Sequence, residues 1–262
     1  MGGMARRGPP RAAIALASVI AMLALWYVAM ATGAVSSARF ATPREFWAAL
    51  TQINVQGYAD AKLWQHVLQS SKLVAMGFAA AVAVGVPLGL AMGWSKRAEA
   101  FFNPPFLLIR PIPPLAWIPL AIVWLGLGDA AKVMVIFVAA FVPSVINSYT
   151  GVRSMEPYLL EAAEMLGVRR WAFIREVLVP GAMPHIFTGL RLSLQAAWTT
   201  LVAGELVGAL HGLGQVLNAA AQDIYPAMIL VGMVFVGLAG GAMTWLLGVA
   251  ERRSMPWRAA ES

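Results

Sequence analysis

The chain has 262 residues, of which 60% are hydrophobic and only 12% are charged, and its mean hydropathy is +0.72. This composition excludes an ordinary soluble domain and indicates a polytopic membrane protein. The net charge of +7 does not indicate nucleic-acid binding, because the basic residues lie at the ends of apolar segments, where membrane topology and anionic headgroups account for them. Because the sequence contains no cysteine, disulfides, thiolate metal sites and thiol nucleophiles are excluded.

Six apolar segments each have about the length that a helix needs to cross a hydrocarbon core, roughly 20 residues. The sequence therefore predicts an all-α polytopic fold with six transmembrane helices in a single transmembrane domain over residues 12–250. Short tails flank this domain at residues 1–11 and 251–262. The predicted spans are 12–31, 73–94, 111–128, 133–152, 192–210 and 224–250.

The first apolar segment has two interpretations. Arg6, Arg7 and Arg11 precede it, and Ala29-Met30-Ala31 resembles the cleavage site of a signal peptide. Its apolar stretch is longer than the roughly 7 to 15 residues typical of signal peptides. We therefore favour an uncleaved membrane anchor over a processed leader.

Two external connections are predicted. The longer one, residues 32–71, contains Trp47 and Trp64, and residues 60–66 have the spacing of an interfacial helix. We expect the two tryptophans to lie at headgroup level; a docking surface for an external partner is the alternative. The second, between the fifth and sixth spans, contains Gly208–Gly214 and Asp223.

Lysine and arginine are distributed unequally over the predicted loops. If the N-terminus is cytoplasmic, twelve of these residues fall on the cytoplasmic side and five on the other, with Arg110 and Arg191 at ambiguous depth. Cytoplasmic loops normally carry the excess of basic residues. The sequence thus predicts a multi-pass protein, embedded in membrane lipid, with both termini in the cytoplasm.

Prolines cluster before and within the third predicted span, in Asn103–Pro105 and Arg110–Pro114. Proline removes an amide donor and clashes with the preceding turn, so we expect the helix to break or kink here. Non-helical backbone at membrane depth is tolerated only where protein or a water-filled cavity covers it, which favours a broken helix that lines a pathway. The candidate pathway or gate residues of this segment are Arg110, Pro111, Pro113 and Pro114.

Polar residues on the fourth and fifth spans extend the predicted pathway. Ionisable groups within a membrane are functional candidates by default, although Glu205 could simply lie at the external end of its helix. The amide and hydroxyl groups could equally bond between helices. Arg110 and Arg191 could neutralise an anionic solute, but headgroup anchoring is the favoured interpretation. The pathway candidates on these spans are Asn147, Gln195, Thr199, Thr200 and Glu205.

A charged insert between the fourth and fifth spans predicts a cytoplasmic two-helix hairpin over residues 153–185. Pro157 suits the first turn of a helix, and Gly167 suits a left-handed ending. A second helix is expected from about Arg170 to Leu178, with Pro180 helping to stop it.

The charges of this insert balance, with four arginines and four glutamates in 153–185. Leu159, Leu160, Ala163 and Leu166 can share an apolar face. A helix lying on anionic lipid would usually be basic, so a neutral hairpin with an apolar stripe fits a groove in a protein better. A loop that merely connects two spans is the alternative.

The hairpin also resembles a known family. Glu161-Ala162-Ala163, then Gly167 and Pro180 at the same spacing, resemble the signature of binding-protein-dependent ABC importer permeases, from which the chain departs with Val177 and Val179 in place of Ile and Leu. Segments 110–120, 124–128, 151–154 and 178–181 resemble the nitrate, sulfonate and taurine branch, and 61–66, 197–203 and 256–257 are closest to taurine permeases.

The resemblance implies a type I ABC importer permease of the bacterial inner membrane, paired with a second permease copy as a homodimer. It further implies two copies of a separate ABC ATPase and a periplasmic or lipid-anchored solute-binding protein. The ATPase would bind ATP and Mg, since this chain contains no Gly-x-x-x-x-Gly-Lys-Ser/Thr loop and is expected to carry no cofactor. The implied ATPase-coupling residues are Glu161, Ala162, Ala163, Glu164, Leu166, Gly167 and Pro180.

The expected solute is taurine or a related aliphatic sulfonate, with nitrate or another small organic anion as the alternative. A secondary transporter is a more remote alternative, and an inverted repeat would support it. A membrane-embedded enzyme would need convergent catalytic groups, and the sequence offers no clear set. His66, His185 and His211 are too scattered to indicate a metal site, and no catalytic residue is predicted.

Overall fold

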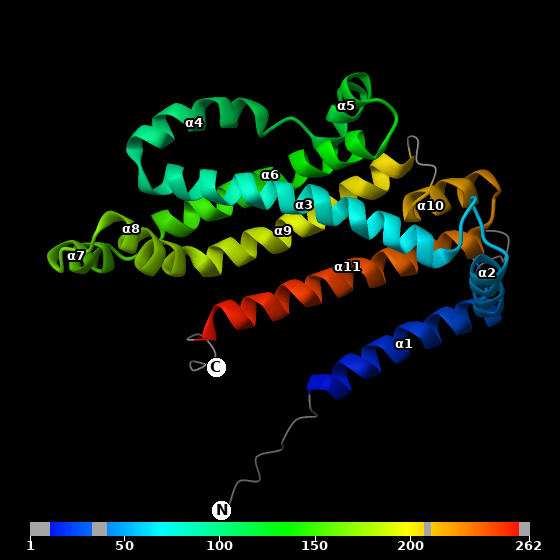
Figure 1. The fold of residues 1–262 in the computed structure, drawn as a ribbon. Coiled ribbons are helices and arrows are strands. Elements are labelled where there is room, and N and C mark those ends of the chain that lie inside the picture. Colours follow the sequence, from blue (N-terminus) through cyan, green and yellow to red (C-terminus); the bar gives the residue numbers. More distant parts are fainter. Residues whose placement is uncertain (1–10, 33–40, 207–210, 257–262) are drawn as a thin grey trace, which may run out of the picture.

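The computed structural model describes residues 11–32, 41–206 and 211–256. All the regular elements in these ranges are helices (Figure 1). In chain order they are α1 (Arg11–Ala31), α2 (Pro43–Val55), α3 (Leu63–Trp94), α4 (Lys96–Ile109), the 3-10 turn η1 (Pro114–Trp117), α5 (Ile118–Leu125), α6 (Asp129–Arg153), α7 (Pro157–Met165), α8 (Arg170–Phe173), the π-helical η2 (Ile174–Leu178), α9 (Val179–Leu206), α10 (Leu213–Gln222) and α11 (Pro226–Ser254).

Helices α3, α6 and α9 pack closely because small residues line their contacts. On α3, a Cβ added to Gly85 would stand 2.9 Å from the Cβ of Ser144 on α6. At Gly89 it would collide with the carbonyl oxygen of Val145. A Cβ at Gly189 of α9 would stand 2.6 Å from the Asn147 Cβ of α6. Small residues allow such close approach between membrane helices, where dispersion contacts replace the hydrophobic effect as the driving force.

The main core lies where α2, α10 and α11 meet these three helices. Its buried members come from every one of these elements, which binds them into one unit. They include Ile53, Leu73, Ile136, Leu194, Leu201, Leu213 and Met228. In Figure 1, α2 and α10 lie at one end of the molecule, and α7 and α8 lie at the opposite end.

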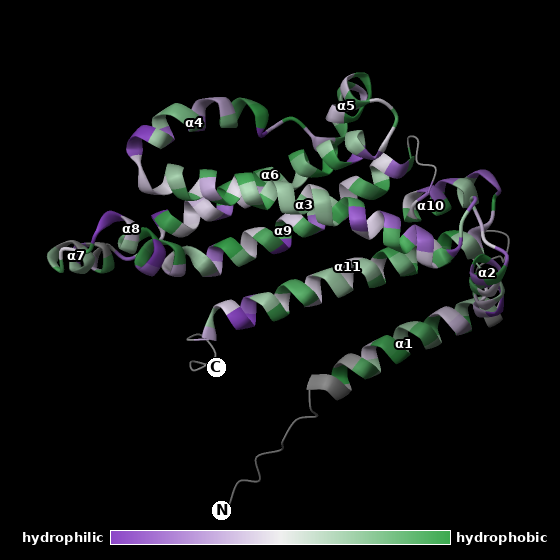
Figure 2. Ribbon diagram, viewed as in Figure 1, coloured by the Kyte–Doolittle hydropathy of each residue, from purple (hydrophilic) through white to green (hydrophobic). Residues whose placement is uncertain are grey.

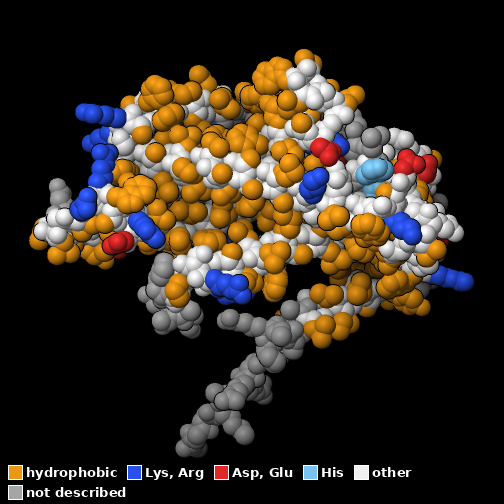
Figure 3. Space-filling view, viewed as in Figure 1, with side chains coloured by type: hydrophobic (Ala, Val, Ile, Leu, Met, Phe, Trp, Pro, Cys, Tyr) orange, Lys and Arg blue, Asp and Glu red, His pale blue; other side chains and the backbone are white. Residues whose placement is uncertain are grey.

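The outer surface is apolar, as a lipid environment requires. Figure 2 shows hydrophobic residues along the length of the long helices, and Figure 3 shows apolar side chains over most of the visible face. Within the described ranges, α3, α6 and α11 are long and apolar enough to cross a membrane, and a fourth span results if α4 and Pro114–Leu125 are taken together. Helices α1 and α9 lie at the remaining predicted span positions.

The third span is broken, as its prolines predict, although its helices do not follow the predicted bounds of 111–128. Helix α4 and the segment Pro114–Leu125 meet at a bend of 84°. Pro111, Pro113 and Pro114 account for the break, because none has an amide hydrogen to continue the ladder. Pro104 and Pro105 lie inside α4 without ending it.

Two of the segments predicted to be external differ from the prediction. Residues 60–62 are not helical; Asp60 has a positive φ of 62°, and α3 begins at Leu63. The described part of the second connection contains α10, which the sequence reading treated as a loop; residues 207–210 lie outside the described ranges. At the C-terminus, α11 continues through Glu251 to Ser254, beyond the predicted end of the sixth span.

Candidate functional sites in the hairpin and the helix bundle

The hairpin begins as its proline and glycine predict. Pro157 is the first residue of α7, and a glycine with φ of 65°, Gly167, follows the helix. The Val168 N–H donates to the Ala163 carbonyl at 3.2 Å, and the Leu166 N–H donates to the Ala162 carbonyl at 3.0 Å. The first of these is the six-to-one bond of a Schellman ending, which needs a left-handed residue between its ends.

The hairpin presents large apolar side chains to its surroundings. Met165, Leu166 and Trp171 are 87%, 81% and 75% exposed, and Tyr158 and Leu159 are also exposed. We call these five residues the hairpin surface. Glu161 and Ala162 are exposed beside them, whereas Ala163 is buried. Of the predicted apolar stripe, Leu159 and Leu166 point outward and Ala163 does not, while the side chain of Leu160 lies outside the described residues. Lys and Arg also gather at this end of the molecule (Figure 3).

The second half of the hairpin does not stop at Pro180, contrary to the prediction. Helix α8, η2 and α9 follow one another without a break from Arg170 to Leu206. The Val179 N–H bonds to the Ile174 carbonyl, which makes the turn before Pro180 a wide π turn. Pro180 directly follows this π turn inside the continuous helix, and the wide turn accommodates a residue that has no amide hydrogen for the ladder.

Two contacts hold the hairpin to the bundle. The Arg170 guanidinium lies 4.8 Å from the ring centroid of Trp94, at the end of α3. The Trp94 and Phe173 rings are 6.2 Å apart, and Phe173 packs beside Val152 and Leu178. The hairpin is thus fixed by its second half, while α7 projects from the bundle (Figure 1).

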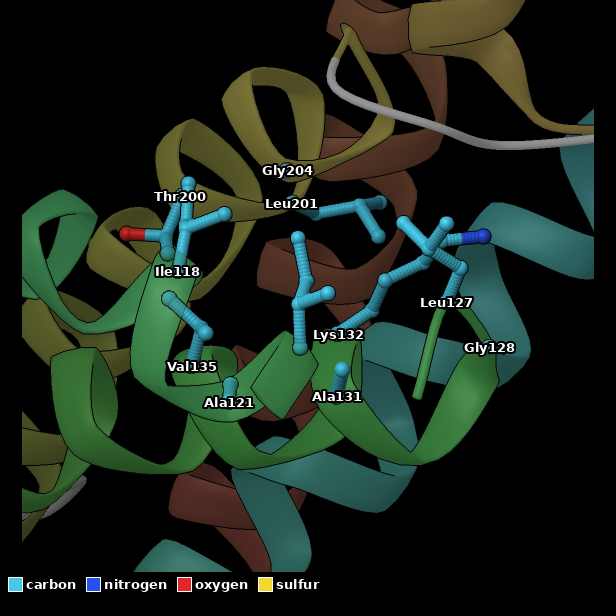
Figure 4. Close-up of a pocket in the computed structure, with 11 residues that line it drawn as sticks. Ile118, Ala121, Leu127, Gly128, Ala131, Lys132, Val135, Thr200, Leu201 and Gly204 are labelled. Atoms are coloured by element: carbon cyan, nitrogen blue, oxygen red, sulfur yellow. The ribbon is translucent and has the colours of Figure 1, made fainter. Parts of the chain in front are cut away.

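The break in the third span leaves Arg110, Pro111 and Pro113 exposed and Pro114 half-buried. The following α5 encloses a narrow apolar pocket with α6 and α9, in which Figure 4 shows side chains from all three helices. Its volume of about 30 Å³ is of the order of a single water molecule. Of the pathway candidates, Thr200 lines this pocket.

Lys132 lines the same pocket and was not among the predicted site residues. Its side chain is only 11% exposed, and its Nζ lies 3.6 Å from Asp129 Oδ1. In the sequence, Lys132 is only one of the five basic residues on the predicted non-cytoplasmic side. Its position directly before the apolar segment 133–152 was the available signal.

The other pathway candidates lie in three different places. Gln195 and Thr199 line a groove between α9 and α11. The Asn147 amide donates to the Pro143 carbonyl at 2.9 Å, one turn earlier on α6. Glu205 is fully buried at the junction of α9, α3 and α10. The structure therefore does not gather the candidates into one site.

Glu205 belongs to a network that also includes Ser70 and His66, which the sequence reading missed. Glu205 accepts hydrogen bonds from the Ser70 hydroxyl and the Gly214 N–H, both at 2.7 Å. The Ser70 oxygen accepts from the Leu213 N–H at 2.9 Å, and His66 Nδ1 accepts from the Gly212 N–H at 3.0 Å. Three buried side chains therefore satisfy the free amides at the start of α10.

The fold and its exposed hairpin define a polytopic all-α membrane protein. A sequence profile for binding-protein-dependent transport system inner membrane components matches residues 85–255, and the chain belongs to this family. It is an ABC importer permease of the taurine, sulfonate and nitrate branch, which confirms the predicted resemblance.

Two relatives and one solved structure illustrate the similarity. The chain is 33% identical over 245 residues to the taurine transport system permease protein TauC of Escherichia coli (strain K12), covering 93% of this chain and 89% of TauC. It is 30% identical over 230 residues to the bicarbonate transport system permease protein CmpB of Synechococcus elongatus, covering 86% and 83%. An inward-facing structure of the MetNI methionine ABC transporter is similar to this chain with a TM-score of 0.61. The match covers 73% of this chain and 93% of the chain in that structure, at 20% sequence identity, and it supports the fold.

Proposed function

We propose that the chain forms the translocation path of an ATP-driven importer for taurine or a related aliphatic sulfonate. The similarity to TauC over 93% of the chain carries this proposal. The similarity to CmpB, a bicarbonate permease by name, keeps nitrate or another small anion as the second candidate.

The hairpin surface is the proposed docking site for a separate ATPase subunit, present in two copies. Five exposed apolar side chains at one end of the molecule form the kind of patch that marks a protein interaction site. Glu161 and Ala162 lie exposed in the same helix, Ala163 is buried, and Gly167 shapes the turn. ATP and Mg would be bound by that subunit, because the sequence here has no nucleotide loop.

The end that carries the hairpin is proposed to face the cytoplasm. Lys96 and Arg97 at the start of α4, Arg153 at the end of α6 and Arg169 before α8 lie at this end of the long helices. Excess basic residues favour the cytoplasmic side. With this orientation α2 and α10 face a solute-binding protein on the other side, and both termini are cytoplasmic.

The helical continuity from Arg170 through Leu206 supports a mechanical role for the hairpin. Closure of the ATPase pair on ATP would draw the hairpins of two permease copies together. Because α8, η2 and α9 are continuous, that displacement would tilt α9 against α6 and α11. A hairpin separated from α9 by a flexible linker would lose most of this motion.

Uptake of labelled solute into proteoliposomes that contain the whole importer tests the function. We expect ATP-dependent uptake of taurine or a short alkanesulfonate, in competition with the unlabelled compounds but not with nitrate. Preferential competition by nitrate or bicarbonate would instead establish the second candidate. Uptake that follows an ion gradient without ATP would identify a secondary transporter and overturn the proposal.

Co-purification of the ATPase with permease variants tests the docking site. Glu161→Lys should release the ATPase, because it reverses a charge beside the hairpin surface. Glu176→Lys makes the same charge change at an exposed position in η2 and serves as the matched control. Equal retention by both variants and the wild type would contradict docking at α7.

A further inference from the structure

Helices α3 and α4 meet in a tight corner, residues 94–99, which we call the α3–α4 corner. Helix α3 ends at Trp94 and α4 begins at Lys96, so Ser95 alone joins them. The Ser95 side chain accepts a hydrogen bond from the Ala98 N–H at 3.3 Å, which caps the start of α4. A displacement of the corner therefore acts directly on the first turn of α4.

Three side chains hold the corner to the end of α6. The Tyr149 hydroxyl donates to Glu99 Oε1 at 2.5 Å, and the Arg153 guanidinium donates to Glu99 Oε2. The same guanidinium lies 5.6 Å from the ring centroid of Tyr149. Each carboxylate oxygen of Glu99 thus has its own donor, and both donors come from α6. We call Glu99, Tyr149 and Arg153 the clasp.

Glu99 is the central member of the clasp. Its side chain is 23% exposed, whereas that of Arg153 is 45% exposed. An ion pair between fully exposed side chains contributes little to stability, but charge-assisted hydrogen bonds to a partly covered carboxylate are shorter and stronger than neutral ones. The clasp is therefore a specific link between α4 and α6 rather than a loose surface pair.

Both halves of the hairpin connect to this corner. Arg153 is the last residue of α6 and Pro157 is the first of α7, so only a short linker separates the clasp from the first half. Met155 of that linker is half-buried and packs against the bundle. The second half reaches the corner through Arg170, which lies over the Trp94 ring. Movement of the hairpin therefore has two contacts through which it can displace the corner.

Beyond the corner, α4 has few contacts that hold it to the bundle. Among its residues, all of which the structure describes, only Phe106 is buried, and its ring centroid lies 6.2 Å from that of Phe141 on α6. Phe101, Leu107 and Leu108 are exposed. In Figure 1, α4 arches away from α3 and α6 before the chain reaches α5. A displacement of its first turn would thus move α4 and the proline-rich break that follows it.

We propose that the clasp transmits movement of the hairpin to α4, and through α4 to the break in the third span. This inference rests on the proposed function. Glu99 is a positioning residue in this scheme, because it acts through Tyr149 and Arg153 rather than on the solute. The clasp adds a second path to the one through α9 and directs it to the broken span. A static anchor that only fixes α4 in place is the alternative, and the experiment separates the two.

The ratio of solute taken up to ATP hydrolysed, measured in the same proteoliposomes with the whole importer, tests the clasp. The probe is labelled taurine, or nitrate if the uptake test selects the second candidate. Glu99→Gln keeps the size of the side chain but removes its charge, and Tyr149→Phe removes the second donor. In the double variant the ratio should fall about fivefold or more, the lower end of typical coupling between sites, while hydrolysis continues.

Two further variants distinguish transmission from anchoring. Phe106→Leu loosens the apolar contact of α4 but leaves the clasp intact, so the thermal unfolding midpoint should fall while the ratio stays at the wild-type value. Glu99→Arg combined with Arg153→Glu exchanges the two charges and rebuilds the ion pair. It should recover much of the ratio that Glu99→Arg alone loses.

Three outcomes would overturn the clasp. They are a wild-type ratio in the Glu99→Gln/Tyr149→Phe variant, an equal loss of the ratio in Phe106→Leu, which would make Glu99 a static anchor, and no recovery on charge exchange. Uptake by the wild type distinguishes the two proposals. If it depends on ATP while the clasp variants stay coupled, only the clasp is refuted; if it does not depend on ATP, the proposed function fails and the clasp fails with it.

Discussion

Ser70 on α3 donates a 2.7 Å hydrogen bond to Glu205 on α9, and both side chains are completely buried although 135 positions separate them in the sequence. The same carboxylate accepts from the Gly214 N–H, and the Ser70 oxygen accepts from the Leu213 N–H. A single polar contact therefore joins two long helices to the start of α10. In low-dielectric surroundings such a network is strong when complete and costly when broken.

Glu205→Ala should destabilise the protein, because it leaves two buried donors without their acceptor. We expect the free energy of unfolding to fall by about 3 kcal/mol, from roughly 1–3 kcal/mol for each unsatisfied group. Thermal unfolding of the detergent-solubilised protein measures the change. Glu176→Ala, at an exposed position, should leave the midpoint unchanged. Equal midpoints for both variants would show that the network does not support the fold.

Gly89→Ala should destabilise the contact between α3 and α6. The added methyl group would collide with the Val145 carbonyl oxygen and stand 2.7 Å from the Ser148 Cβ. Overpacking of this kind typically costs about 1–3 kcal/mol. Gly248→Ala is the matched control, because a Cβ there meets nothing within 4 Å. The unfolding midpoint should drop only for Gly89→Ala; a drop of the same size in both would refute the packing argument.

Gly167→Ala should loosen the hairpin turn. An L-residue at φ of 65° costs about 1–2 kcal/mol relative to glycine, and asparagine tolerates this conformation better. Hydrogen exchange measured by mass spectrometry over residues 157–168 should therefore be fastest in Gly167→Ala, intermediate in Gly167→Asn and slowest in the wild type. The Val168 amide, which closes the turn, should report the change most directly. Identical exchange in all three proteins would mean that the left-handed residue does not control the turn.

Tyr58 should make stability depend on pH in the alkaline range. Its hydroxyl donates to Asp223 Oδ2 at 2.5 Å, and burial, followed by this carboxylate, raises the pKa of Tyr58 above its usual value. The unfolded chain then loses this proton at lower pH than the folded protein, so the contribution is complete below about pH 10 and declines as pH rises further.

The unfolding midpoints of the wild type and Tyr58→Phe, followed from pH 8 to pH 11, test this sign. The wild type should be more stable at pH 8, and its advantage should shrink above about pH 10. Tyr225→Phe, which removes a hydroxyl bonded to Gln52 Oε1 instead, is the control. A gap between wild type and Tyr58→Phe that widens with pH would contradict the assignment.

Much of the hairpin could be predicted from local chemistry. Pro157 and Gly167 specify backbone dihedrals directly, so the start of α7 and its left-handed ending were both predicted. Pro180 was predicted wrongly because its effect depends on the preceding turn. A π turn directly before this proline accommodates it, so the helix continues through Pro180 into α9.

The candidate pathway shows that residue type alone does not predict which polar side chains the fold brings together. Residue type alone nominated Gln195, Thr199, Thr200 and Glu205, yet the structure distributes them over a groove, a pocket and a buried network. Ser70 and Lys132 were missed because residue type alone does not mark them. A serine hydroxyl becomes part of a network only when partners from other helices lie within reach, and a lysine is notable only when other helices cover it.

The amino-acid sequence by itself determined the membrane environment, the all-α class, the family and the break in the third span, because apolar run length, proline and glycine act through the solvent and the local backbone. Only the tertiary structure decided which polar groups meet. Contacts such as Ser70 with Glu205, or Arg191 with Glu251, depend on the register between helices. For α3, α6 and α9 the packing of small residues sets this register. Helical periodicity specifies which face a residue occupies, but not which residue of another helix lies opposite it.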